Sequence, residues 1–434
     1  MSNQTEVHAA EIQEIQRQIR AMVPGVDTVA AGVALPHPKT PQGRTRVLHM
    51  NYTRNRANQP VATEQAYLRF FAQTAKKLGI HLEILTCIQS VADVKAELGQ
   101  NEFNGLDYSL LTSQNPVSKW AEDSVEYLAD GRMAVLTPFQ DDLLAWAMTE
   151  GRRQRWQSLV SPETLADMLA FDERWVPLGI RVNASATGQV RSRLAQAQGQ
   201  SVGQIRAYIE GGNMITGEDQ AGRPIILVGQ DAIATTANLY QLEAHQVKQI
   251  IQEDFSLETP EQVISVEQPG QFHLDMGLLF IGYGVVVIND SRTALQDALE
   301  MAEFAPCETT RTMATKRQLQ CQLEAIATQD LLAAGLKVIP QALANDVMYN
   351  FFNGEFVEGS DQHQYYITNG GPKDQEDFFA KRMVVDWQVV DHVVFSSPPL
   401  AHKSLQERGG VGCRLKGSGT KGWRSPHDSD IQSG

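Results

Sequence analysis

The chain alternates between two kinds of segment along most of its length. Short apolar runs typical of strands occur at 47–50, 82–85 and 284–288, and runs with helical spacing occur at 63–78 and 291–304. Further strand-like runs lie at 224–228, 276–281, 338–340, 348–352, 365–368 and 390–395, and a further helical run lies at 241–254. Strands that alternate with helices in this way predict an α/β fold.

Turn signals separate some of these strands without a helix between them. The Asn-Gly pairs at 353–354 and 369–370 are hairpin-type dipeptides between apolar residues, and the Gly-Tyr-Gly run at 282–284 predicts a turn between two strands. A purely parallel sheet does not need hairpins, so mixed sheets built from ββαβ units fit the pattern better. No segment repeats another in sequence, so any internal symmetry has to be structural.

Length and charge restrict the classes of partner. The 434 residues include 37 Lys+Arg and 51 Asp+Glu, which gives a net charge of −14, and 42% of the residues are hydrophobic. This balance is typical of a folded protein. Nucleic acid and anionic membranes require a basic surface, so the composition argues against both as partners and remains compatible with a cationic substrate.

The termini and the cysteines indicate a soluble protein in a reducing compartment. No signal-peptide pattern is visible, and no run approaches the roughly 18–20 apolar residues that span a bilayer. The four cysteines are far apart, without metal-site or disulfide-scaffold spacing: Cys87, Cys307, Cys321 and Cys413. We expect a cytoplasmic protein with an N-terminal helix and loop over 1–45, a main domain over 46–416 and a flexible tail over 417–434.

Four short segments carry residues capable of chemistry. The segment 120–126 has three acids beside a tryptophan, 209–214 has a double glycine, 272–275 contains His-x-Asp, and 409–413 is glycine-rich and ends in Cys413. Taken alone, the first also fits a solvated acidic loop, the second a turn, and the third a structural histidine at a strand end. The glycines around Cys413 predict an accessible thiol at a loop.

Together the segments supply a thiol, an imidazole and several carboxylates. The cysteine comes last, which is not the papain order, and the caspase motif is missing. A guanidinium ion is planar and presents its N–H donors in a fixed fork that carboxylates match. Two separate carboxylates therefore suit a guanidinium substrate better than a peptide bond.

This set of segments resembles the guanidino-group-modifying (pentein) superfamily, which contains protein-arginine, agmatine and arginine deiminases, dimethylargininases and amidinotransferases. The resemblance covers roughly 46–415 and is greatest to the catalytic domain of protein-arginine deiminases, through Trp120, Asp123, Glu126 and the Gly-Asn-Met run at 212–214. It implies a five-bladed α/β propeller of ββαβ units with the site in a central channel.

The resemblance also implies a role for each of four residues. Asp123 and Asp275 would hold the guanidinium, His273 would be the general acid and base, and Cys413 would be the nucleophile. The implied activity is hydrolysis of an arginine guanidinium to citrulline and ammonia through a covalent thiouronium intermediate, with protein or peptidyl arginine as the expected substrate. The chemistry itself needs no cofactor.

Some positions depart from the family pattern. Leu415 stands two residues after Cys413, where Thr or Ser is common. Glu122 and Glu126 match calcium-ligand positions of the calcium-dependent members, but Ile215 stands where a further acidic ligand is expected. The implied calcium set is therefore incomplete. In place of the N-terminal immunoglobulin-like domains of the vertebrate enzymes, the chain shows a short helix and loop.

Other activities fit the same residues. An amidinotransferase would pass the amidino group to an amine instead of water, and a small-molecule deiminase would take free arginine or agmatine. A non-catalytic member of the fold, of the kind that acts on the ribosome, would not need the four residues, and this chain keeps all of them. The sequence distinguishes neither the acceptor nor the size of the substrate.

Overall fold

The computed structural model describes residues 34–137, 141–157, 161–163, 165–166, 178–269, 273–346 and 348–419. The helix expected near the N-terminus and the part of the tail beyond 419 lie outside these residues. In the part of the chain that is described, no helix is long and apolar enough to cross a membrane.

The strands are short, as the sequence predicted. They are β1 (Val47–Tyr52), β2 (His81–Cys87), β3 (Tyr108–Ser113), β4 (Glu126–Tyr127), β5 (Met133–Leu136), β6 (Val202–Ile205), β7 (Met214–Glu218), β8 (Pro224–Gly229), β9 (Val263–Val266), β10 (Leu278–Gly282), β11 (Val285–Asn289), β12 (Lys337–Gln341), β13 (Gly354–Glu358), β14 (Gln364–Thr368), β15 (His392–Phe395) and β16 (Leu415–Ser418). β16 extends two residues beyond the expected end of the main domain at 416.

The helices follow the strands in a regular order. They are α2 (Ala62–Leu78), α3 (Val91–Leu98), α4 (Asp141–Gln157), α6 (Leu178–Ala197), α7 (Gln230–Tyr240), α8 (Ala244–Asp254), α9 (Arg292–Phe304), α10 (Glu308–Ala333), α11 (Lys373–Lys381), α12 (Pro398–Gln406) and α13 (Val411–Arg414). Short 3-10 turns include η1 (Pro41–Gly43), η4 (Glu122–Ser124), η5 (Gly211–Asn213) and η7 (Leu274–Met276). α2 ends at Gly79, whose φ of 64° is left-handed and costs glycine little.

The strands form five small sheets with one connection pattern. Four sheets have the orders β4-β5-β6, β7-β8-β9, β10-β11-β12 and β13-β14-β15. In each, the first two strands are antiparallel, and one or more helices then lead to a third strand that is parallel to the second. The predicted ββαβ connectivity is therefore confirmed.

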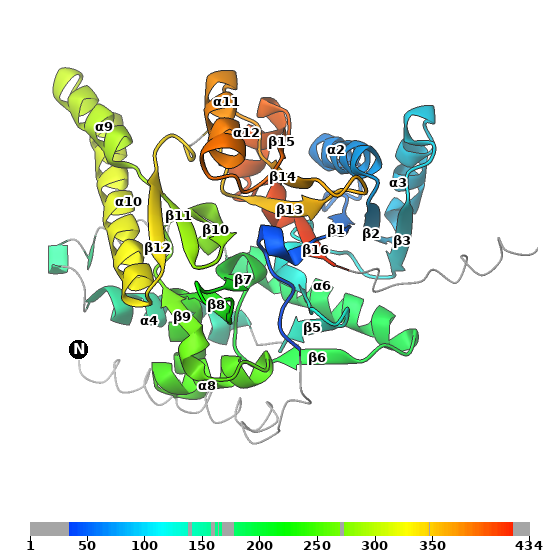
Figure 1. The fold of residues 1–434 in the computed structure, drawn as a ribbon, viewed down its shortest axis with the longest axis horizontal. Coiled ribbons are helices and arrows are strands. Elements are labelled where there is room, and N and C mark those ends of the chain that lie inside the picture. Colours follow the sequence, from blue (N-terminus) through cyan, green and yellow to red (C-terminus); the bar gives the residue numbers. More distant parts are fainter. Residues whose placement is uncertain are drawn as a thin grey trace, which may run out of the picture.

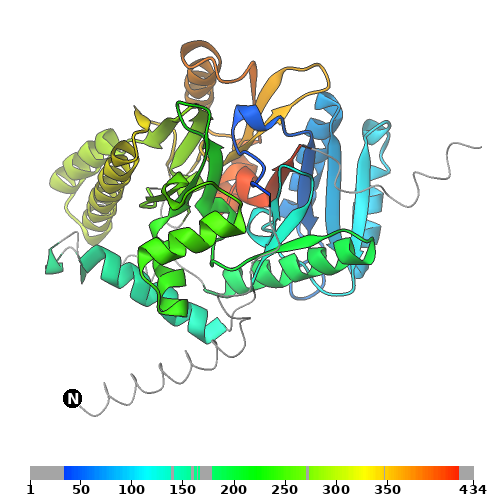
Figure 2. The ribbon, with the colours of Figure 1, turned by 60° about the horizontal axis from the view of Figure 1, so that its bottom comes forward.

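The fifth sheet is built from both parts of the chain. Its order is β16-β1-β2-β3, in which β16 pairs antiparallel with β1, and β1 pairs parallel with β2. The C-terminal strand thus takes the place that the first strand has in the other four sheets. Figures 1 and 2 show the sheets following one another around the middle of the molecule, with α13 near the centre.

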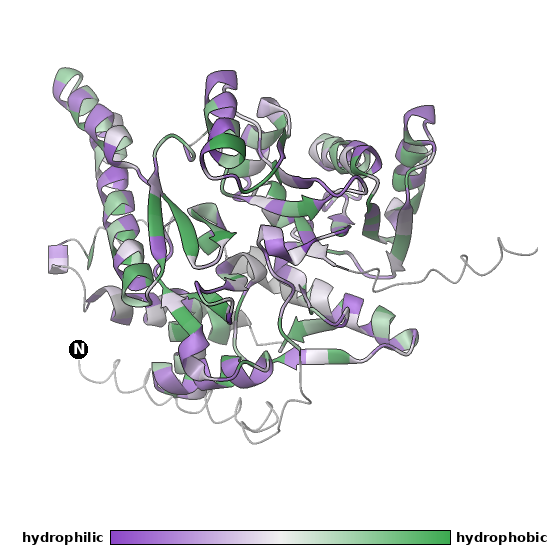
Figure 3. Cartoon of the chain, in the orientation of Figure 1, coloured by the Kyte–Doolittle hydropathy of each residue, from purple (hydrophilic) through white to green (hydrophobic). Residues whose placement is uncertain are grey.

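Apolar clusters fill the space between neighbouring sheets. One joins Ile226 and Val228 of β8 to Leu136 and Ile205, and another joins Leu227 of β8 to Phe280 of β10. Similar clusters join β10 and β11 to β13 and β14, and β13 and β14 to β1 and β2. Figure 3 shows the strands largely apolar and the outer helices mixed in character, so the core lies between sheets and under helices.

A segment ahead of β1 crosses from sheet to sheet. We call residues 36–46, which include η1, the crossing segment. It contacts the first strand of every sheet. Its amides donate from His37 to Tyr127 O of β4 (2.8 Å), from Lys39 to Thr216 O of β7 (3.0 Å) and from Arg46 to Ser418 O of β16 (2.9 Å). Its Thr45 carbonyl accepts from Glu358 N of β13 (2.8 Å), and its Gln42 side chain lies against Gly282 of β10. These contacts fix the segment at the centre.

Of four expectations about turns and strands, one was right and three were wrong. The 282–284 turn joins β10 and β11, as expected. The run at 348–352 is not a strand, Asn353 precedes β13 directly, and 369–370 leads to α11 and a parallel strand. The hairpin between β13 and β14 turns at 359–363 instead. Glycine is required at 354 and 370 for close packing and not for hairpin turns: a Cβ on Gly354 would lie 2.4 Å from the Ile367 carbonyl oxygen, and one on Gly370 would lie 2.0 Å from the Ser396 carbonyl oxygen.

A buried polar network holds the sheet of β1 against the sheet of β4. Arg191 of α6 donates to Glu83 Oε1 (2.7 Å), to the Tyr127 hydroxyl (3.0 Å) and to Asn51 Oδ1 (2.8 Å). His49 stacks on Tyr127 and contacts Glu83 through Nδ1 (2.8 Å). Arg191 is 1% exposed, so its charge is balanced within the protein.

We expect Arg191→Met to lower the free energy of unfolding by about 3–5 kcal/mol, because it leaves the buried Glu83 carboxylate without its main counter-cation. Urea denaturation measures the change. Arg69→Met is the control: the Arg69 side chain is 49% exposed and pairs with Glu97, so its loss should cost about 1 kcal/mol or less. Equal losses in the two variants would contradict this account of the network.

Candidate active site

Polar residues gather where the first strands of the sheets begin. η4 precedes β4, η5 precedes β7, η7 precedes β10, Asn353 precedes β13, and α13 precedes β16. η4 contacts η5 and α13, and η5 contacts η7. These starts lie at the end of the first strands opposite the crossing segment. The five sheets therefore bring five short segments, distant in sequence, into one place.

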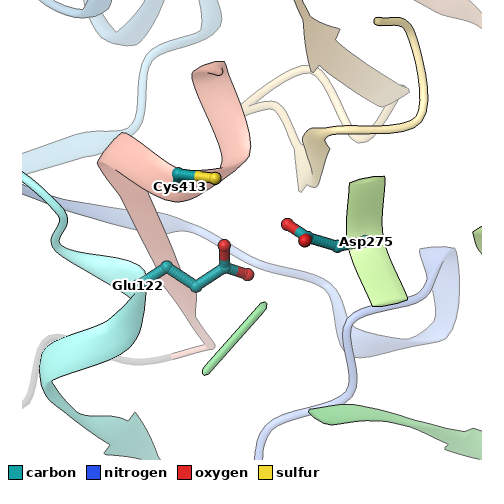
Figure 4. Close-up of side chains that lie close together, drawn as sticks. All are labelled: Glu122, Asp275 and Cys413. Atoms are coloured by element: carbon teal, nitrogen blue, oxygen red, sulfur yellow. The ribbon is translucent and has the colours of Figure 1, made fainter. Parts of the chain in front are cut away.

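The four residues singled out from the sequence lie together. His273 Nδ1 is 3.8 Å from Asp123 Oδ1. Side-chain atoms of Asp275, Cys413 and the additional residue Glu122 lie within 4.8 Å of one another, and Figure 4 shows the three side chains facing a common space. All of these side chains are buried.

Glu210 completes the surroundings of the imidazole. Glu210 Oε2 lies 2.7 Å from His273 Nε2, and Tyr208 donates its hydroxyl to the other carboxylate oxygen (2.7 Å). His273 therefore has a carboxylate on each side, Glu210 at Nε2 and Asp123 near Nδ1. This arrangement fixes the plane of the ring and stabilises the protonated imidazole.

The double glycine beside Glu210 is explained by close packing. A Cβ on Gly211 would lie 2.1 Å from the Glu122 carbonyl oxygen, and a Cβ on Gly212 would lie 2.6 Å from His273 Nδ1. The Gly212 amide donates to Asp123 Oδ1 (3.4 Å). Only glycine lets this backbone approach both the η4 turn and the imidazole so closely.

Asn353 links the thiol to a carboxylate. Its Nδ2 donates to Asp275 Oδ2 and lies 3.3 Å from Cys413 Sγ, while its Oδ1 accepts from the Cys413 amide (3.2 Å). One amide side chain thus orients both Cys413 and Asp275.

The glycines before Cys413 serve packing and not access. A Cβ on Gly409 would lie 2.2 Å from the Trp120 ring, and one on Gly410 would lie 2.6 Å from Asn353 Oδ1. Cys413 is in the short helix α13 and is only 2% exposed. The expectation of an accessible loop thiol was therefore wrong, because the glycines allow α13 to settle against its neighbours. Cys307 is the exposed cysteine.

A lysine from the crossing segment also reaches the site. Lys39 Nζ forms a hydrogen-bonded ion pair with Glu122 Oε1 and lies 3.3 Å from Asp275 Oδ2. Its side chain is 12% exposed. An ammonium group therefore stands between two of the central carboxylates.

Glu122 and Glu126, the two residues matched to calcium ligands, each have a lysine of their own. Lys39 pairs with Glu122, and Lys416 of β16 pairs with Glu126 at 2.7 Å. A calcium ion needs several oxygen ligands and no adjacent cation. The positions of the two ammonium groups do not fit a calcium ion held jointly by these carboxylates.

The carboxylates shift one another's protonation. Burial raises the pKa of Asp123 to about 6, although His273 opposes the shift. Burial and the charge of Glu122 raise the pKa of Asp275 to about 8 against the effect of Lys39. Burial would lower the pKa of His273, but the negative charges of Asp123, Glu210 and Asp275 raise it to about 9.

The thiol responds to the same charges. Burial, followed by the nearby Asp275, Glu122 and Asp123 carboxylates, raises the pKa of Cys413 well above its ordinary value. A cation placed among these carboxylates would act in the opposite direction and favour the thiolate. A cation bound among these carboxylates would therefore lower the pKa of the Cys413 thiol.

A cavity of about 1060 Å³ lies beside the site. Residues after β1, after β2 and in the 116–120 loop line it, and they include Arg54, Arg56, Lys119 and Trp120. Trp120 also belongs to the apolar cluster that contains Cys413. The indole is therefore part of both the cavity lining and the apolar cluster around the thiol.

Three residues of the site were not singled out from the sequence. Glu210 directly precedes the Gly-Gly-Asn run that was noted, so a signal was present beside it. Asn353 was interpreted as a turn residue. Lys39 lies in a loop rich in Pro, Thr and Gly, and no local pattern indicates that it reaches Glu122, which is 83 residues away.

Comparisons with known proteins place the fold. No family model and no curated protein sequence matches the chain at a significant level. A solved structure described as a "putative agmatine deiminase" is 13% identical, with 89% of this chain and 96% of that chain covered and a TM-score of 0.56. The structure of an arginine dihydrolase from cyanobacteria is 11% identical, with 88% of this chain and 40% of that chain covered and a TM-score of 0.34. The first likeness shows a shared fold.

We expect Glu210→Gln to move the pKa of His273 down from about 9 toward its ordinary value of 6.5, because the carboxylate that stabilises the imidazolium is lost. Titration of the imidazole by NMR measures the shift. A raised pKa in the folded state adds stability that is fully present below pH 6.5 and is lost as the pH rises through about 9. The difference in unfolding free energy between the wild type and Glu210→Gln should therefore shrink as the pH rises from 6.5 to about 9. An unchanged imidazole titration would refute the pairing of His273 with Glu210.

Proposed function

We propose that this chain is a deiminase that hydrolyses the guanidinium group of arginine or an arginine-like compound to a ureido group and ammonia. The observation that carries the proposal is the convergence of Cys413 with Asp123, Asp275 and the His273–Glu210 pair in one buried site. A shared fold with a structure described as an agmatine deiminase supports it. We also propose that the five sheets are the blades of the propeller that the sequence resemblance implies.

The substrate cation would lie between Asp123 and Asp275. Each carboxylate accepts N–H donors from one side of the planar guanidinium, which directs its carbon at Cys413 Sγ. The positive charge lowers the pKa of the thiol, whose proton leaves to solvent. The resulting thiolate then attacks the guanidinium carbon and forms a C–S bond.

His273 would serve both halves of the reaction. As an imidazolium, it gives its proton to the departing nitrogen, so the C–N bond breaks and ammonia leaves a thiouronium bound to Cys413. The neutral imidazole then takes a proton from water, which attacks the same carbon. The C–S bond then breaks, the hydroxyl proton leaves to solvent as the C=O bond forms, the neutral ureido product leaves, and the Cys413 thiolate and the imidazolium are restored.

The size of the substrate is a second part of the proposal. The sequence resemblance favoured protein or peptidyl arginine, whereas the structure that shares the fold is described as acting on agmatine, a small molecule. The reacting groups are buried, which favours a small substrate over a peptide segment. The cavity beside Trp120 is lined by the cations Arg54, Arg56 and Lys119 and also by the carboxylates Glu64 and Glu407. We propose a small guanidino compound that enters from this cavity, with peptidyl arginine as the alternative that the assay below compares.

The proposed reaction needs no calcium ion. Lys39 and Lys416 neutralise the two glutamates that would have been calcium ligands.

The proposed location is the cytoplasm. None of the four cysteines is in a disulfide, which supports a reducing compartment.

We expect the purified protein to form a ureido product from at least one of free arginine, agmatine, dimethylarginine and an arginine peptide, equally with calcium and with EDTA. The departing amine should be ammonia, or dimethylamine in the case of dimethylarginine. Cys413→Ala should abolish turnover because it removes the nucleophile, and Cys307→Ala, at an exposed cysteine, should not. Mass spectrometry and ammonia release measure both. Full activity in Cys413→Ala would refute the assignment, and turnover only with an added amine would identify an amidinotransferase.

Asn353→Ala should lower kcat about ten- to hundredfold, because the hydrogen bonds that orient Cys413 and Asp275 are worth about 1–3 kcal/mol. Steady-state kinetics with the best substrate measure the loss. Asn238→Ala is the matched control, since Asn238 makes one hydrogen bond to the Ala147 carbonyl, away from the site. Equal kcat in the Asn353 variant and the wild type would show that Asn353 does not orient Cys413 and Asp275 for the reaction.

A further inference from the structure

Lys39 is fixed in place by its own backbone as well as by its side chain. The Lys39 amide donates to Thr216 O of β7 at 3.0 Å. Pro41 and Thr45, further along the crossing segment, are buried. Since this segment contacts the first strand of every sheet, Lys39 belongs to the permanent structure of the centre and not to a loop that swings away.

The ammonium group meets two carboxylates that face the thiol. It pairs with Glu122, which is 0% exposed, and with Asp275 Oδ2. A third buried carboxylate, Glu355 of β13, adds to the negative charge around the ammonium. Without Lys39, these carboxylates would lie together with much less compensation, which is costly in a buried site.

The geometry also assigns the two oxygens of Asp275 different roles. Oδ2 accepts hydrogen bonds from Lys39 and from Asn353. Oδ1 accepts none from any N–H group of the described residues. Lys39 and Asn353 thus hold the carboxylate by one oxygen and leave the other for the substrate.

Resting on the function proposed above, we propose that Lys39 is a positioning residue: a built-in counter-cation that holds Glu122 and Asp275 in the orientation that binds a guanidinium. It supplies from within the chain the positive charge that a bound metal ion would supply beside Glu122. Asp275 then grips the substrate through Oδ1, opposite Asp123.

A rival interpretation assigns Lys39 the opposite effect. An ammonium on Asp275 could instead occupy the place of the substrate cation and compete with it. The two interpretations differ in sign: loss of a positioning cation weakens substrate binding, whereas loss of a competitor strengthens it.

Lys39→Ala tests the difference. We expect KM for the guanidino substrate to rise about ten- to hundredfold with a smaller change in kcat, because Asp275 loses the charge-assisted hydrogen bond that holds it. Lys39→Arg, which keeps the charge, should retain much of the affinity. Arg46→Met is the matched control, since Arg46 is a cation of the same segment whose partner is Glu358, outside the site.

Chemical rescue separates a positioning role from a general loss of structure. Propylammonium has the atoms that Lys39→Ala removes beyond Cβ. Millimolar propylammonium should therefore lower KM in the Lys39→Ala variant and leave KM of the wild type unchanged. Propanol, of similar size but neutral, should not. A lower KM in Lys39→Ala than in the wild type, or rescue by propanol as strong as by propylammonium, would overturn the proposal.

A readout without turnover keeps this proposal distinct from the proposed function. Cys413 can be alkylated by a haloacetamidine, which is a planar cation, or by neutral iodoacetamide, and peptide mapping separates it from the other cysteines. Lys39→Ala should lower the ratio of the two rates about tenfold relative to the wild type. If the wild type hydrolyses no guanidino compound, the deiminase proposal fails, while an unchanged ratio in a folded variant would refute the role of Lys39.

Discussion

Negative charge buried at the centre of the molecule is the constraint on which the site depends. Glu122, Asp123, Glu210 and Asp275 are all almost inaccessible to solvent. Buried carboxylates are stable only beside cations or when they are protonated. The protein places an imidazole among them on one side and the Lys39 ammonium on the other. These two cations leave an excess of carboxylates, and under the proposed function a bound guanidinium would offset part of that excess and favour the Cys413 thiolate.

The repeated sheets explain how such a cluster can be built at all. Each sheet delivers one short segment at the start of its first strand, so no single segment has to carry the whole site. Cys413 depends on this most, because its strand β16 becomes part of a sheet only by pairing with β1 near the other end of the domain. The crossing segment joins the same first strands at their far ends. Formation of the site is thereby coupled to assembly of all five sheets.

Most of the fold and half of the site could be predicted from local patterns. Apolar runs and helical spacing predict ββαβ units because each unit is local in sequence. The segments that hold Asp123, His273, Asp275 and Cys413 stood out locally, and the resemblance to the guanidino-group-modifying superfamily then selected these four residues within them. Glu210, Asn353 and Lys39 were not recognised, since their roles depend on contacts with other sheets. An Asn-Gly pair predicts a hairpin turn on local grounds. Only the contacts of Asn353 with Cys413, which lies 60 residues away, show that Asn353 belongs to the site.

The sheets share a backbone pattern but no sequence repeat, because each sheet supplies different side chains to the site. Asn213 and Asn353 both directly precede the first strand of a sheet, at β7 and β13. Yet Asn213 donates to Asp231 of its own unit, whereas Asn353 donates to Asp275 and Cys413 of two other units. Equivalent backbone positions thus carry different chemical tasks, and glycine is required wherever the neighbouring segment approaches. Because each unit supplies different side chains to the candidate site, the units differ in sequence while their backbone pattern stays the same.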